Sequence, residues 1–153
     1  MKITVLAVGK MRDRAVIGLC DEYRDRLGHH LPVEVVEVKK SGARIPKQVM
    51  DEEGERLAAA TPDGALTVAL TEEGKGLSSV ELAQNLNQWM VEGRKDIAFY
   101  VGGAHGLSGA LKHSAHRRWS LSKLTFPHDI ARMLLWEQLY RGMTIIRREP
   151  YHK

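Results

Sequence analysis

The segment that decides the fold is Ile97–Gly109, with the sequence IAFYVGGAHGLSG. Its first five residues are apolar, and Gly102, Gly103 and Gly106 follow them closely. A buried strand that ends in a glycine-rich turn is typical of the ligand edge of an α/β sheet, because glycine lets the backbone approach a ligand. The spacing matches neither the G-x-G-x-x-G dinucleotide motif nor a P-loop. The turn therefore predicts either a ligand site or a tight turn without a ligand.

Around this segment, apolar strand-like runs alternate with amphipathic helix-like patterns. Strands are predicted over Lys2–Val8, Val33–Val38, Ala65–Leu70 and Ile97–Val101. Helices are predicted over Val16–Leu27, Ile45–Ala60, a segment from a Ser78–Glu81 capping box to Gly93, Ser108–His116 and Ile130–Arg141. The alternation predicts an α/β fold with a mostly parallel sheet and helices on both faces. We expect a single domain over residues 1–153.

Three segments are expected to meet at the carboxyl edge of this sheet. Thr71–Leu77 and Gly102–Leu107 are both predicted as glycine-bearing loops after strands, and Leu121–Phe126 lies within an extended segment, Trp119–Phe126. Next to these, Asp129 is predicted to cap the last helix, and Gly28 to end the first. A pocket at this edge is the principal candidate site.

Composition narrows the classes of protein that fit. The chain has 153 residues, of which 43% are hydrophobic and 27% charged, as in an ordinary globular protein. No apolar run approaches the ~18–20 residues of a membrane span, and no secretory signal pattern is present. The single Cys20 excludes an intramolecular disulfide and fits the reducing cytoplasm. The histidines lack metal-ligand spacing, so we expect neither a metal nor a membrane partner.

Positive charge is concentrated toward the C-terminus. Residues 1–111 carry 14 Lys and Arg against 16 Asp and Glu, whereas residues 112–153 carry 9 against 3. A basic end on a nearly neutral body indicates an anionic partner or a merely solvated basic surface. For RNA, the candidate phosphate contacts are Lys112, Arg117, Arg118, Lys123, Arg141, Arg147 and Arg148.

Four sequence segments together resemble a known family. They are VGG at Val101–Gly103 with Gly106-Leu107, SLSKLTFPH at Ser120–His128, Arg132 with EQLYR at Glu137–Arg141, and PYHK at Pro150–Lys153. The chain resembles the ribosomal RNA large-subunit methyltransferase H family of the SPOUT superfamily, bacterial enzymes that methylate N3 of a pseudouridine in 23S rRNA. The resemblance covers essentially the whole chain, and SLSKLTFPH with the terminal YHK is its most specific part.

The resemblance implies a fold, a cofactor and partners. The sheet is expected to carry a C-terminal trefoil knot, in which S-adenosylmethionine is held mostly by backbone groups. The chain is expected to act as a homodimer on 23S rRNA in the ribosome. The positions that match the family's cofactor segments are Leu70, Gly102, Gly103, Leu121, Ser122, Lys123, Leu124, Thr125 and Phe126.

Three further residues are candidates for catalysis under this resemblance. N3 of the base must lose a proton, and His152 can be neutral near pH 7 and accept it. Tyr151 could stack on the base or form a hydrogen bond to it, and Arg132 could hold a phosphate or stabilise an anion. Which residue takes the proton is left open.

Two other functions stay open on the sequence. One is a ribosome-binding or assembly factor without enzymatic activity, which would need the basic end but no cofactor pocket. The other is a different nucleotide-binding α/β enzyme, such as a reductase, although its G-x-G-x-x-G turn is missing.

Overall fold

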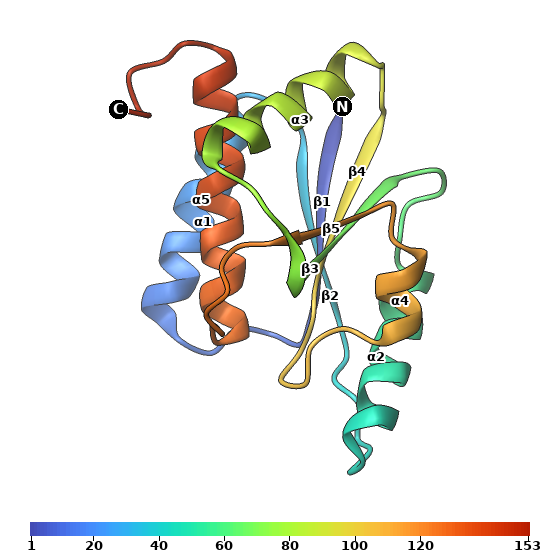
Figure 1. Cartoon of the computed structure of the whole chain (residues 1–153). Helices are drawn as coiled ribbons and strands as arrows, with labels where there is room; N and C mark the ends of the chain where they lie inside the picture. Colours follow the sequence, from blue (N-terminus) through green and yellow to red (C-terminus); the bar gives the residue numbers. More distant parts are fainter.

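The computed structural model describes residues 1–153, in which five strands and five helices alternate (Figure 1). The strands are β1 (Lys2–Val8), β2 (Val33–Val38), β3 (Leu66–Gly76), β4 (Asp96–Val101) and β5 (Arg117–Ser120). The helices are α1 (Arg14–Gly28), α2 (Pro46–Ala59), α3 (Ser79–Val91), α4 (Gly109–Ser114) and α5 (His128–Ile146).

The strands form one sheet in the order β2-β1-β4-β3-β5, and every pair of neighbouring strands is parallel. Helices α1, α3 and α5 cover one face, and α2 and α4 cover the other (Figure 1). Alternate residues of β4 enter the two apolar clusters: Phe99 packs on the first face and Tyr100 on the second. The predicted parallel sheet with helices on both faces is therefore confirmed.

Helix α5 is the most enclosed helix, because it packs between α1 and α3. Leu135, Trp136 and Leu139 are at most 1% exposed. Ile130, Met133 and Leu134 are half-buried, so an apolar edge of the helix stays partly open to solvent. None of the helices has the length and apolarity that crossing a bilayer would require.

Strand β3 is longer than the sequence predicts. The segment Thr71–Leu77 was expected to be a loop, but the strand continues to Gly76 and pairs with β5. The register shifts on the way, since Leu70 and Lys75 both align with Trp119. A Cβ on Gly74 would lie 2.5 Å from the carbonyl carbon of Trp119. Gly74 therefore permits two backbones to pass at close range, and its presence does not signal a loop.

Two element boundaries also differ from the predictions, and a third agrees. Strand β5 covers Arg117–Ser120, and the predicted extended segment after it is irregular up to Pro127. Helix α5 begins at His128, so Asp129 lies in its first turn and does not cap it. The prediction that Gly28 ends the first helix is confirmed, since Gly28 is the last residue of α1, although it does not adopt a positive φ. A polar or glycine residue in the sequence thus predicts that a helix begins or ends nearby, but it does not always identify the terminal residue.

The close passage at Gly74 predicts a difference between two glycines of the same strand. Gly74→Ala should lower the free energy of unfolding by about 1–3 kcal/mol, because the methyl group would push against backbone atoms of Trp119. Gly76→Ala is the matched control, since a Cβ there meets nothing within 4 Å. Urea unfolding of both variants measures the effect. Equal stability of the two variants would contradict the crossing.

Candidate functional site

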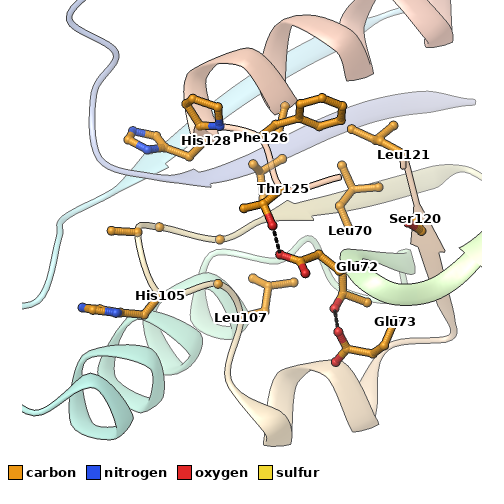
Figure 2. Close-up of a pocket in the computed structure, with 18 of the residues that line it drawn as sticks. Leu70, Glu72, Glu73, His105, Leu107, Ser120, Leu121, Thr125, Phe126 and His128 are labelled. Carbon is orange, nitrogen blue, oxygen red and sulfur yellow. Dashed lines mark hydrogen bonds between the residues drawn. The ribbon is translucent and has the colours of Figure 1, made fainter. Parts of the chain in front are cut away.

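A cavity of about 740 Å³ lies at the carboxyl edge of β3 and β4 (Figure 2). Three backbone segments surround it: the continuation of β3 at residues 70–73, the glycine turn at residues 101–107 and the segment 120–128 between β5 and α5. Met50, Lys112 and Ala131 complete the lining. The three segments that were expected to meet do so, and they form the walls of one pocket.

The glycine turn is tightly closed. Gly103 and Gly106 form an isolated antiparallel bridge, with the amide of Gly106 donating to the carbonyl of Gly103 at 3.0 Å. Gly106 has a φ of +80°, which favours glycine. A Cβ on Gly102 would lie 2.5 Å from the carbonyl carbon of Gly106. No side chain fits at Gly102, so this wall of the cavity is made of backbone.

Eight of the nine residues predicted to bind a cofactor line this cavity. They are Leu70, Gly102, Gly103, Leu121, Ser122, Leu124, Thr125 and Phe126. Lys123 is not among the lining residues and is exposed. It sits between two lining neighbours, so in this structure the backbone of the segment follows the wall while the Lys123 side chain faces solvent.

Two carboxylates at the cavity differ in how they are partnered. Lys112 and Thr71 donate hydrogen bonds to Glu73, and these bonds lower the pKa of Glu73 to about 2. Glu72 accepts only from the hydroxyl of Thr125, at 3.1 Å (Figure 2). Glu73 is therefore neutralised by an ammonium group, whereas Glu72 brings an unbalanced negative charge to the lining. A cationic ligand would complement this charge.

A third carboxylate lies beneath the glycine turn. Glu53 of α2 is 4% exposed, and its Oε1 accepts from the amide of Ser41 at 3.0 Å. Its Oε2 has no hydrogen-bond partner and would lie 2.8 Å from a Cβ on Gly103. Glu53 thus connects the loop after β2 to the underside of the turn.

The sequence did not single out several residues that line the cavity. Glu72 and Glu73 lie on β3 just after its buried apolar part, and that position was a usable signal for a site. Met50 on α2 comes from a distant element and carries no local motif. His128 ends the SLSKLTFPH segment, but no site role was predicted for it. His105 lies within the glycine turn and lines the cavity, although no role was assigned to it. No group of three or more His, Cys, Asp or Glu side chains is placed to hold a metal ion.

Arg132 was expected to act on a substrate, but its position argues against that role. The side chain is 2% exposed and lies outside the cavity lining. Its guanidinium donates to Glu37 Oε1 at 2.6 Å and to the carbonyl oxygen of Gly9 at 3.1 Å. Arg132 therefore connects α5 to the ends of β1 and β2. It is a buried structural cation, because its donors are directed toward the protein.

The C-terminal tail is docked on its own chain. The hydroxyl of Tyr151 donates to Glu137 at 2.9 Å, and its ring meets Tyr140 edge-on at 4.8 Å. Burial and the hydrogen bonds with Tyr23 and Glu137 raise the pKa of Tyr151 well above that of a free tyrosine. His152 Nδ1 lies 3.4 Å from Arg141. The tail is thus ordered by specific contacts.

Within one chain, Tyr151 and His152 are far from the cavity. Helix α5 has 19 residues and spans about 28 Å at 1.5 Å per residue. Its first residue, His128, lines the cavity, and the tail follows its other end (Figure 1). The structure therefore separates these two predicted catalytic residues from the pocket of the same chain.

Comparisons with known proteins give a consistent result. The family model described as "Predicted SPOUT methyltransferase" matches residues 1–152. A protein from Gemmatimonas aurantiaca named "Ribosomal RNA large subunit methyltransferase H" is 41% identical over 155 residues, with 100% of both chains covered. A protein of the same name from Methylobacillus flagellatus is 39% identical over 156 residues, with 100% of this chain and 99% of the relative covered.

Solved structures show the same fold at low sequence identity. A probable methylase family protein from Haemophilus influenzae matches with a TM-score of 0.57 at 12% identity, covering 99% of this chain and 70% of the other. A putative methyltransferase from Legionella pneumophila, solved in complex with S-adenosylmethionine, matches with a TM-score of 0.51 at 11% identity. That match covers 91% of this chain and 65% of the other.

Proposed function

Because the chain belongs to the SPOUT methyltransferase family, we propose that it transfers a methyl group from S-adenosylmethionine to the large-subunit ribosomal RNA. The acceptor is N3 of a pseudouridine in 23S rRNA, as the resemblance to the methyltransferase H relatives implies. The reaction takes place on the ribosome or its RNA, in the cytoplasm. The observation that carries the proposal is the backbone-walled cavity at residues 70–73, 101–107 and 120–128.

The residues of this cavity fit S-adenosylmethionine. Backbone groups at Gly102 and Gly103 are accessible because neither residue has a side chain, and Leu107 and Phe126 add apolar surface. The unbalanced carboxylate of Glu72 complements a cation in the cavity. When bound, the cofactor supplies an electrophilic methyl group on a positively charged sulfur. The chain's own residues orient the two reactants and exclude water.

The cavity residues do not account for the removal of the proton from N3 of the pseudouridine, so another group must accept it. His152 and Tyr151 stay our candidates for contact with the target base, with His152 as the proton acceptor. Since the tail lies about a helix length from the pocket of its own chain, we propose that it serves the pocket of a second copy. The half-buried apolar edge of α5 at Ile130, Met133 and Leu134 supports a homodimer.

The trefoil knot is proposed on the resemblance. In that arrangement the segment 120–128 would be fixed against the two other walls by the path of the chain itself, and its backbone would be held ready for the cofactor.

The first test combines cofactor binding with methyl transfer. The parent protein should bind S-adenosylmethionine in calorimetry and transfer labelled methyl groups to ribosomes from cells that lack the enzyme. Gly102→Ala should weaken cofactor binding at least about tenfold, or 1.4 kcal/mol, because the turn must open to accept a methyl group. Gly109→Ala is the matched control, since a Cβ there meets nothing within 4 Å.

Each alternative gives a different result in this test. Ribosome binding without methyl transfer would favour an assembly factor. Binding of nicotinamide or adenine nucleotides in place of S-adenosylmethionine would favour another enzyme class. If Gly102→Ala and Gly109→Ala bind the cofactor with equal affinity, the glycine turn is not part of the cofactor site.

The second test addresses the tail. Gly102→Val, whose side chain is larger than the alanine methyl group and meets the Gly106 backbone, and a chain shortened by Tyr151–Lys153 should each be inactive alone. Refolded together in equal amounts, they should recover about a quarter of the parental rate, because half of the random dimers are mixed and each has one complete site. No recovery, with dimers present in sedimentation, would contradict a shared site.

A further inference from the structure

A second cavity, of about 390 Å³, lies at the carboxyl ends of β1 and β2 and has no role in the methyl-transfer site. Its lining consists of Gly9, Lys10, Arg12, Glu37, Val38, Lys39 and Lys40. Four of these seven residues carry positive charge and one carries negative charge. This charge is unexpected, because the first 111 residues hold more acidic than basic side chains.

The only carboxylate in the lining is already neutralised. Glu37 is paired with the buried guanidinium of Arg132 at 2.6 Å. The carboxylate of Asp13, next along the chain, accepts hydrogen bonds from Ala15 and Val16 at the start of α1. Lys10, Arg12, Lys39 and Lys40 form no ion pair or side-chain hydrogen bond in the structure. The cavity is therefore surrounded by unbalanced cations.

The backbone that carries Lys39 and Lys40 is held in place. The carbonyl oxygen of Lys39 accepts from Arg56 at 2.8 Å, and the amide of Ser41 donates to Glu53 at 3.0 Å. The stem of Lys40 lies across Gly9, where an added Cβ would be 2.2 Å from Lys40 Cε. Four like charges around one small space repel each other. The four side chains are exposed to water, and an anion bound between them would reduce this repulsion. Phosphate is an anion that Lys and Arg recognise well.

The position of the cavity indicates where that phosphate comes from. Both cavities lie at the same edge of the sheet, since β1, β2, β3 and β4 are parallel. The second cavity is at β2 and β1, and the first is at β4 and β3, so about two strand spacings, or roughly 10 Å, separate them. A few nucleotides of an RNA strand can span this distance.

We infer that the Gly9–Lys40 cavity binds a backbone phosphate of the RNA substrate, close to the nucleotide whose base enters the methyl-transfer site. The inference rests on the proposed function and adds an RNA contact in the first third of the chain. It differs from the footprint predicted from the basic C-terminal quarter. Four members of that footprint already form contacts within the chain: Lys112 with Glu73, Arg141 with Glu137, Arg147 with the carbonyl of His30 and Arg117 with the carbonyl of His116.

The test removes two of these cations and measures binding to ribosomes from cells that lack the enzyme. Lys10→Gln combined with Lys39→Gln should weaken ribosome binding and reduce the slope of log affinity against log salt by about 2, one for each lysine. The KM for ribosomes should rise, while kcat and the affinity for S-adenosylmethionine stay unchanged. Lys40 is kept because its stem packs on Gly9.

Arg94→Gln combined with Lys95→Gln is the matched control. Both residues are exposed and precede β4, at the opposite edge of the sheet. This control should keep the parental affinity and salt slope. An unchanged slope in the Lys10 and Lys39 variant, or an equal loss in the control, would overturn the inference.

Two more outcomes are informative. Normal ribosome affinity of the Lys10 and Lys39 variant, with lost binding to phosphatidylglycerol vesicles, would assign the cavity to a membrane surface and overturn the inference. Failure of the parent protein to bind S-adenosylmethionine or to methylate ribosomes would overturn the proposed function instead. Even in that case, the slope of log ribosome affinity against log salt, measured for the parent and both variants, would show whether the cavity binds RNA.

Discussion

The backbone of Gly102 passes so close to Gly106 that no side chain can stand between them, and the site depends on this contact. It closes the turn after β4 and leaves peptide groups as one wall of the cavity. The segment after β5 and the continuation of β3 form the other walls. A pocket made of backbone selects its ligand by shape and hydrogen bonding, and Glu72 adds the one unbalanced charge.

Arg132 shows how one side chain can organise an edge of the molecule without touching a substrate. From α5 it reaches Glu37 on β2 and the carbonyl oxygen of Gly9 after β1. Removing Glu37 would leave the buried guanidinium of Arg132 with the carbonyl oxygen of Gly9 as its one remaining hydrogen-bond partner, which is unfavourable for a buried charge. The same contact neutralises Glu37 and leaves the surrounding lysines without a balancing charge, so a structural ion pair also determines the electrostatics of the second cavity.

The alternation of strand-like and helix-like apolar patterns was sufficient to predict the parallel sheet. Eight of the residues that the family resemblance assigned to cofactor binding line the cavity. Sequence reasoning failed where a residue's role depends on distant neighbours. Gly74 was interpreted as a loop residue because its contact, Trp119, lies 45 positions further along the chain. Arg132 was predicted to act in catalysis because the sequence does not show that its side chain is buried. That burial arises only when α1 and α3 pack around α5. The distance between Tyr151 and the cavity of its own chain follows from the direction of α5, which no local motif reveals.

The central claim is that three backbone segments at one edge of the sheet hold S-adenosylmethionine. Amide chemical shifts of the isotope-labelled protein, recorded while S-adenosylmethionine is added, test it most directly. The account predicts that the largest changes fall on residues 70–73, 101–107 and 120–128, with residues 9–12 and 37–40 little affected. Changes concentrated on residues 9–12 and 37–40, or no saturable changes at the three segments, would contradict it.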